Sequence, residues 1–290
     1  MKRRHRALLE LVRPPNVATA LADVLAGYAI AGQPAPHALP LLLVSTACLY
    51  AGGVVLNDFF DRHLDAVERP ERPIPSGRIP AATAAAWGTA LLVLGIIAAA
   101  WAGPIPALVA AAVAASAVLY DAWAKHSRLA GPANMGLCRG LNLLLGVAAA
   151  PPALAAHWPL AMIVVLYIAG VTVMSQGEVH GGRQTPALVA TALVGIAAIL
   201  GAFPAFATGH GRIAASSLAA LLVWRTAPVF LRAWRTGLAS DVRTAVRAGV
   251  LSLVLLDAAL AAAYAGMIYA VGIIVVSLAA GRLARAFAVT

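Results

Sequence analysis

Three aspartates spaced along one short segment are the side chains of this chain best suited to chemistry. The run Asn57-Asp58-Phe59-Phe60-Asp61-Arg62-His63-Leu64-Asp65 follows a long apolar stretch. If the helix continues through the run, Asp58, Asp61 and Asp65 share one face at i, i+3 and i+7. Like charges this close repel unless a hard cation lies between them, and Mg²⁺ is bound by carboxylates together with substrate phosphates. The spacing therefore predicts a magnesium site for a diphosphate; an acidic, solvated loop end is the alternative.

The loop after the aspartates is basic. Residues 68–79 read Glu-Arg-Pro-Glu-Arg-Pro-Ile-Pro-Ser-Gly-Arg-Ile, and the prolines and glycine prevent a long regular helix. Arg69, Arg72 and Arg78 offer forked N–H donors that match phosphate oxygens. An ordinary basic loop beside a membrane is the alternative for each arginine alone. Because the loop adjoins the aspartates, we predict that Arg72 and Arg78, with Asn57, contact a phosphate-bearing substrate.

The elements that must position these residues are membrane helices. The chain of 290 residues is 62% hydrophobic and 11% charged, against about half and about a quarter in soluble proteins. Apolar runs long enough to span a bilayer recur from end to end, which predicts an all-α, polytopic membrane bundle. We expect one domain over residues 1–290, with membrane lipids around it. The candidate spans are approximately 16–33, 38–57, 81–102, 105–121, 132–151, 158–177, 186–207, 213–233, 243–264 and 266–286.

Lysine and arginine are concentrated in alternate loops, which predicts that both termini are cytoplasmic. The intervening loops hold only Arg212. The net charge of +10 is therefore assigned to membrane topology, with no nucleic acid as partner. The basic side chains of the cytoplasmic loops and ends are Lys2, Arg3, Arg4, Arg6, Arg13, Arg62, Arg69, Arg72, Arg78, Lys125, Arg128, Arg183, Arg232, Arg235, Arg243, Arg247, Arg282 and Arg285.

The aspartate run resembles the first aspartate-rich motif of the UbiA superfamily of intramembrane prenyltransferases. That motif reads NDxxDxxxD with RPxxxG-like text after it, as residues 57–65 and 69–77 do here. Arg13-Pro14-Pro15-Asn16 and the segment from Tyr120 to Lys125 are similar to two further family segments. The resemblance covers residues 10 to about 265. It implies a bundle of typically nine spans, so nine to ten here, with a central cavity open to the cytoplasmic side.

The family's second aspartate-rich motif is altered in this chain. Residues 175–183 read Ser-Gln-Gly-Glu-Val-His-Gly-Gly-Arg. The resemblance implies that Glu178 ligates a second Mg²⁺, because a carboxylate suits that ion. His180 is softer, and we expect a proton acceptor or a phosphate donor there, or only a polar loop residue. Residues 119–126 and 131–142 look like the UbiA-like protein of ebo-type bacterial gene clusters, which implies a bacterial inner membrane.

The resemblance implies that a prenyl diphosphate is the donor substrate and Mg²⁺ the cofactor. Mg²⁺ held by Asp58, Asp61 and Glu178 would neutralise the departing diphosphate. Arg72, Lys125 and Arg183 would add cationic donors where the charge develops. The acceptor, aromatic or lipophilic, then loses a proton to a base that the sequence leaves open. The candidate bases are His180, Glu178 and Asp121.

Polar residues within the apolar spans predict a cavity wall. Arg139 and Asn142 lie at i and i+3 on the fifth span, and Asn134 precedes them. Ionisable groups in a membrane are costly and often functional. We therefore expect Asp23 to face a central cavity, and Asp257 to pair with an interior arginine such as Arg225. Further predicted cavity residues are Asn16, Tyr120 and Asp121.

Two other functions remain open at this stage. A cation-coupled transporter would use the acidic motif to bind its substrate, and a catalytically silent scaffold for export of a metabolite precursor would keep the fold alone. Magnesium-dependent prenyl transfer separates an enzyme from both.

Overall fold

The computed structural model describes the backbone of residues 2–34, 36–178, 181 and 184–287, and every regular element in these ranges is helical. The predicted all-α fold is confirmed. The elements are α1 (Lys2–Val12), α2 (Pro14–Ile30), α3 (Ala38–Phe60), α4 (Arg62–Glu68), α5 (Ala81–Ala102), α6 (Pro104–Ala122), η1 (Ala124–His126), α7 (Ala130–Val147), α8 (Pro151–His157), η2 (Trp158–Leu160), α9 (Ala161–Ser175), α10 (Gln184–Thr208), α11 (Arg212–Thr236) and α12 (Ala239–Phe287).

Within the described residues, seven helical segments are long and apolar enough to cross a membrane, and a shorter apolar segment, Val17–Ile30, lies in α2. Each predicted span overlaps a helix. The last two predicted spans both fall in α12, which is broken at Gly266, where φ is 80° and ψ is 178°. A positive φ suits glycine, which has no Cβ. The break lies at the predicted turn, while the number of membrane crossings stays a prediction.

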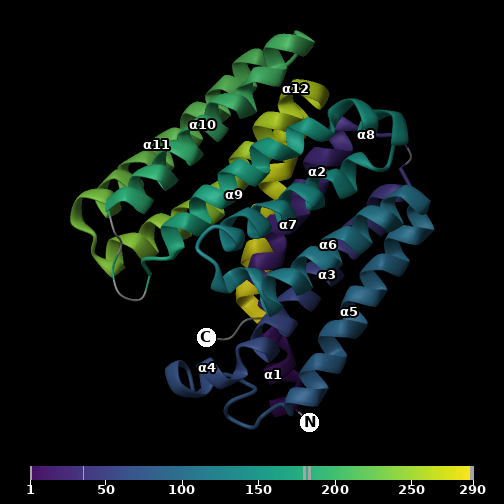
Figure 1. Ribbon diagram of the computed structural model, residues 1–290. Coiled ribbons are helices and arrows are strands. Elements are labelled where there is room, and N and C mark those ends of the chain that lie inside the picture. Colours follow the sequence, from purple (N-terminus) through teal and green to yellow (C-terminus); the bar gives the residue numbers. More distant parts are fainter. Residues whose placement is uncertain (1, 35, 179–180, 182–183, 288–290) are drawn as a thin grey trace.

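The helices form one bundle, with α1 and the end of α12 at the same pole (Figure 1). Figure 1 shows α10 and α11 along one flank and α5 along the opposite flank. Inside, α3 packs against α5, α2 against α12, and α7 against α9. The short helices α1 and α4 lie at the pole where α12 ends (Figure 1). That this pole faces the cytoplasm stays a prediction.

Helices α2 and α7 cross at backbone contact. A Cβ added to Gly27 would lie 2.0 Å from the carbonyl oxygen of Leu143, and one added to Gly146 would lie 2.2 Å from that of Val24. Such close approach is typical of membrane helices, where small residues let backbones pack without a hydrophobic driving force. The crossing fixes the spacing between the polar side chains of α2 and α7.

The helix does not continue through all three aspartates, because α3 ends at Phe60 and α4 begins at Arg62. Asp61 lies between them, with φ −83° and ψ 1°. The Arg62 guanidinium donates to the Phe59 carbonyl at 2.9 Å and lies 4.7 Å from the Phe59 ring centroid. That side chain satisfies a carbonyl oxygen at the end of α3, where intrahelical partners run out.

Candidate active site

The first and third aspartates of the motif meet at one cationic atom. Arg72 Nη1 lies 3.3 Å from Asp58 Oδ1 and 2.6 Å from Asp65 Oδ2. Asp58 also accepts a hydrogen bond from Arg13, which precedes α2. Both aspartates are buried, at 3% and 4% exposure. The bend at Asp61 therefore leaves the end of α3 and the start of α4 facing the same guanidinium.

The second aspartate is held by the segment between α6 and α7. Lys125 Nζ, on η1, lies 2.6 Å from Asp61 Oδ1. Close by, Asn57 Nδ2 donates to Asp121 Oδ1 at 2.7 Å. The segment from Tyr120 to Lys125, which resembles a family segment, therefore contacts the aspartate motif directly. We call Asp58, Asp61, Asp65, Arg13, Arg72 and Lys125 the motif cluster.

The donor chemistry of the motif cluster fits a hard cation. Carboxylate oxygens are the ligands that Mg²⁺ prefers, and a cationic nitrogen of Arg72 already lies between two of them. In the described part of the chain, no three histidine, cysteine or acidic side chains converge on one point. A magnesium ion there would take its remaining ligands from water and substrate phosphate, as this ion commonly does.

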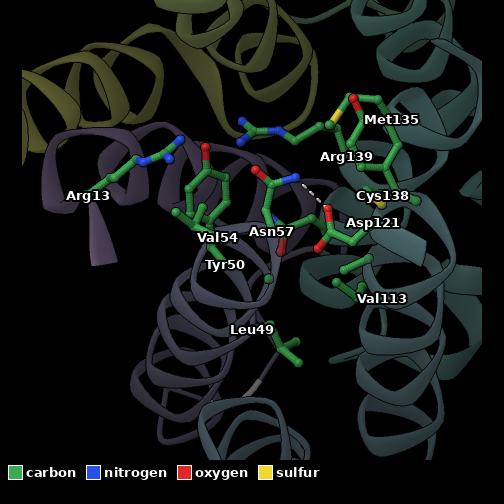
Figure 2. Close-up of a pocket in the computed structure, with 14 residues that line it drawn as sticks. Arg13, Leu49, Tyr50, Val54, Asn57, Val113, Asp121, Met135, Cys138 and Arg139 are labelled. Carbon is green, nitrogen blue, oxygen red and sulfur yellow. Dashed lines mark hydrogen bonds between the residues drawn. The ribbon is translucent and has the colours of Figure 1, made fainter. Parts of the chain in front are cut away.

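An apolar cavity of about 290 Å³ adjoins the motif cluster. Arg13 belongs to both, so the cavity meets the aspartates at this side chain. The wall is formed by α3, α6 and α7, and Figure 2 shows Tyr50 between Arg13 and Arg139. The lining residues are Arg13, Leu49, Tyr50, Gly53, Val54, Asn57, Val113, Ala117, Tyr120, Asp121, Met135, Cys138, Arg139 and Asn142.

Five predicted substrate-binding residues lie in this wall: Asn57, Tyr120, Asp121, Arg139 and Asn142. Three predicted positions cannot be placed, because His180, Arg183 and the Asn16 side chain lie outside the described residues.

Two other predicted residues lie elsewhere. Asn134 does not line the cavity; its Oδ1 accepts from Ser116 Oγ at 2.9 Å and so joins α7 to α6. Arg78 is exposed and pairs with Glu10 at 2.6 Å. It also donates to the Glu71 carbonyl, so its bonds to Glu10 and Glu71 secure α1 against the loop after α4.

Glu178, the acid of the altered second motif, is half-buried between α9 and α10. Burial raises the pKa of its carboxyl, while the charges of Arg69 and Arg243 oppose that shift. Arg243 also donates to the Glu178 carbonyl oxygen at 3.0 Å. Because Arg69 directly follows α4, the second motif lies on the side of the bundle that carries the first.

Some site residues escaped the sequence analysis. Arg13 was noted as part of a family segment, yet its contact with Asp58 and its place in the cavity were not predicted. Tyr50 was missed altogether. Its spacing of seven residues before Asn57 on α3 places both on one helix face, and that periodicity was the available signal.

The fold and the site together define a polytopic helical membrane protein with an acidic and basic cluster over an apolar cavity. A profile described as the UbiA prenyltransferase family matches residues 20–176. A digeranylgeranylglyceryl phosphate synthase of Methanoregula boonei is 30% identical over 215 residues, covering 73% of this chain and 76% of that protein. The chain belongs to the UbiA prenyltransferase family.

Other relatives match over a shorter region. A protein of the same name from Ignicoccus hospitalis is 38% identical over 141 residues, which is 49% of this chain and 46% of that protein. This chain thus spans about half the length of that curated relative. These two relatives do not support the predicted location in a bacterial inner membrane. Membership of the ebo-type subgroup also stays a prediction.

Solved structures share the fold at low identity. A UbiA homologue from Aeropyrum pernix K1 is 18% identical, with a TM-score of 0.70 over 84% of this chain and 96% of that one. A UbiA homologue from Archaeoglobus fulgidus, bound to GPP and Mg²⁺, is 16% identical, with a TM-score of 0.54 over 98% of this chain and 100% of that one.

Proposed function

We propose that this chain transfers the prenyl group of a prenyl diphosphate to a lipophilic acceptor within the membrane, with Mg²⁺ as cofactor. The observation that carries the proposal is the position of Arg13, which binds Asp58 in the motif cluster and lines the apolar cavity. A diphosphate at the cluster would therefore place its hydrocarbon chain toward the cavity. The relatives' name and the GPP and Mg²⁺ in a structural neighbour support the same reading.

The motif cluster supplies the groups for the diphosphate end. Asp58, Asp61 and Asp65, with Glu178 from the second motif, are the proposed Mg²⁺ ligands. When bound, Mg²⁺ supplies Lewis-acid neutralisation of the leaving diphosphate. Three basic side chains now bound to these aspartates, Arg13, Arg72 and Lys125, would donate to phosphate oxygens instead.

The reaction breaks the bond between C1 of the prenyl group and the ester oxygen that joins it to the first phosphate. The electron pair leaves with the diphosphate. An allylic cation results, and Tyr50 and Tyr120 in the cavity wall offer ring faces that attract a cation. Apolar wall residues such as Val54, Val113 and Met135 exclude water that would otherwise capture it. A nucleophilic atom of the acceptor then bonds to C1 and releases a proton.

Among the candidate bases, Asp121 is the one we propose. It lies in the cavity wall, and its Oδ1 accepts from Asn57, the residue next to Asp58. A base must come within hydrogen-bonding reach of the proton that it accepts. Glu178 is not among the lining residues of the cavity, which supports its assignment to the metal rather than to proton transfer.

The acceptor class follows from the cavity and from the relatives. The predicted acceptors were aromatic or lipophilic compounds, and the relatives' name denotes a glyceryl phosphate that carries geranylgeranyl groups. A glyceryl phosphate lipid is therefore a candidate beside aromatic compounds.

Purified protein in liposomes, given Mg²⁺, labelled prenyl diphosphates and extracted membrane lipids, should form a labelled lipid and release diphosphate. Chelation of Mg²⁺ should stop both. Counterflow of intact labelled substrate across the liposome membrane without diphosphate release would favour the transporter. If the protein shows no product formation and no counterflow, the silent scaffold is favoured.

A further inference from the structure

A second ionic group lies inside the bundle, apart from the motif cluster. It consists of Asp23 on α2, Arg139 and Asn142 on α7, and Asp257 on α12, and we call it the buried network. Asp23 and Asp257 are both 0% exposed. Asn142 is also tied to α3, because its Oδ1 accepts from Thr46 Oγ1 at 2.6 Å. The network therefore joins four helices beside the cavity wall, which Arg139 and Asn142 help to form.

Both carboxylate oxygens of Asp23 accept hydrogen bonds. Its Oδ1 accepts from Arg139 Nη2 at 3.0 Å, and its Oδ2 accepts from Asn142 Nδ2 at 2.8 Å. Arg139 Nε also lies 2.9 Å from Oδ2, close enough for an ion pair but without a hydrogen bond. Arg139 Nη1 and Nη2 donate to the hydroxyl and carbonyl oxygens of Thr19, at 3.3 and 2.9 Å. The guanidinium is thus committed to one carboxylate and one helix backbone.

Asp257 has no such donors. Among the described residues, no N–H or O–H group bonds to either of its oxygens. The nearest ionisable group that interacts with it is Asp23, on α2, which packs against α12. The Tyr167 hydroxyl on α9 donates instead to the Gly249 carbonyl at 2.8 Å. Arg225 on α11, the partner predicted for Asp257, is exposed, and no bond between the two is found in the described structure.

The charges of the buried network do not balance if both carboxyls are ionised. Two adjacent anions would face one guanidinium. The other neighbour of that guanidinium is the Tyr50 ring, whose centroid lies 5.9 Å from Arg139 Cζ and which carries no positive charge. A buried charge without a partner is strongly destabilising, and in a membrane the surroundings offer no water to solvate it. A carboxyl in this position becomes neutral by taking up a proton.

We infer that Asp23 and Asp257 form a carboxyl pair that binds one proton, with the Asp257 hydroxyl donating to Asp23. The pair then carries a single negative charge, which balances Arg139. Asp257 is a positioning residue: its hydrogen bond adds a third direction of support to Asp23, which holds the Arg139 guanidinium at the cavity wall. This inference concerns charge and geometry inside the bundle, and it does not depend on the proposed prenyl transfer.

Infrared difference spectroscopy tests the shared proton directly. The spectrum of the wild type minus that of Asp257→Asn at neutral pH should contain the carbonyl band of a protonated carboxylic acid. The matched control is Asp241→Asn, because Asp241, itself 8% exposed, pairs at 3.1 Å with the exposed Arg232 outside the buried network. Its difference spectrum should contain only carboxylate bands. Carboxylate bands in the Asp257→Asn difference would overturn the inference.

A second variant tests the charge balance. In Asp23→Asn the only remaining carboxyl is Asp257, which should ionise beside Arg139, so the acid band should disappear although Asp257 is still present. An acid band that persists in Asp23→Asn would contradict the charge balance.

Thermal unfolding in detergent tests the positioning role of Asp257. Asp257→Asn keeps a neutral donor and should unfold near the wild-type temperature, whereas Asp257→Leu should unfold clearly lower. Equal unfolding of these two variants would remove the positioning role.

Discussion

The motif cluster and the buried network use the same side chains under opposite constraints. In the motif cluster three aspartates face three long basic side chains, and Arg13 remains 33% exposed while bound to Asp58. In the buried network the carboxylate of Asp23 is 0% exposed, and its donors are rigidly placed by α7. Partly exposed basic side chains can leave a carboxylate for a phosphate at little cost. Donors sealed inside the bundle cannot, so the first cluster suits ligand exchange and the second suits structure.

Removing both carboxyls of the buried network should have the largest effect. The double variant Asp23→Asn/Asp257→Asn leaves Arg139 with no anion, and loss of one partner of a buried ion pair costs about 3–5 kcal/mol. Unfolding by heat or denaturant in detergent, followed by circular dichroism, measures the loss. If the double variant is as stable as Asp257→Asn alone, the structural role assigned to the buried network is wrong.

Removing one carboxylate of the motif cluster should act on activity instead of stability. We expect Asp58→Asn and Asp61→Asn to lower kcat/KM for prenyl transfer by about 100-fold or more, the scale at which loss of one charge-stabilising group acts on a developing oxyanion. Unfolding should change less than in the buried-network variants, because removing one of three neighbouring carboxylates also relieves their mutual repulsion.

Asp241→Asn is the matched control for these variants, since it also removes an aspartate from an ion pair with an arginine but lies outside the cavity wall. It should leave the transfer rate unchanged. Activity near that of the wild type in both motif variants would remove the aspartates from the proposed metal site.

Tight packing between α2 and α7 places the two partners of the buried network. A Cβ on Gly146 would lie 2.2 Å from a backbone oxygen of α2, whereas one on Gly195 in α10 meets nothing within 4 Å. We expect Gly146→Ala to cost about 1–3 kcal/mol through overpacking. Gly195→Ala should be neutral or stabilising by up to about 1 kcal/mol, because alanine is the better helix former. Equal unfolding temperatures would mean that α2 and α7 separate without loss.

Sequence reasoning served the motif cluster better than the buried network. The positions of the membrane helices and the acidic motif follow from apolar run length and residue spacing, which are local properties. The partners of Asp23 and Asp257 depend on which helices pack together, and residues 116 and 119 positions away supply the bonds to Asp23. No local pattern encodes those distances. The spacing of the aspartates also left open whether the helix continues through them; the bend at Asp61 occurs where the Arg62 side chain competes for a helix carbonyl.

Glu178 should give the smallest effect, since it bears on the second motif alone. If it ligates a second Mg²⁺, Glu178→Gln should raise the Mg²⁺ concentration needed for half-maximal activity by about 10-fold, the lower end of losses seen when support for a metal site is removed. Glu178→Asp keeps the carboxylate, and its Mg²⁺ requirement should lie between those of the wild type and Glu178→Gln.

Burial raises the pKa of Glu178, so Mg²⁺ must displace a proton more often as the pH falls. The Mg²⁺ requirement of the wild type should therefore rise toward acid pH, and that of Glu178→Gln should rise less. Titration of Mg²⁺ at two pH values measures both. Identical requirements in the wild type and Glu178→Gln at either pH would leave the motif cluster as the single metal site.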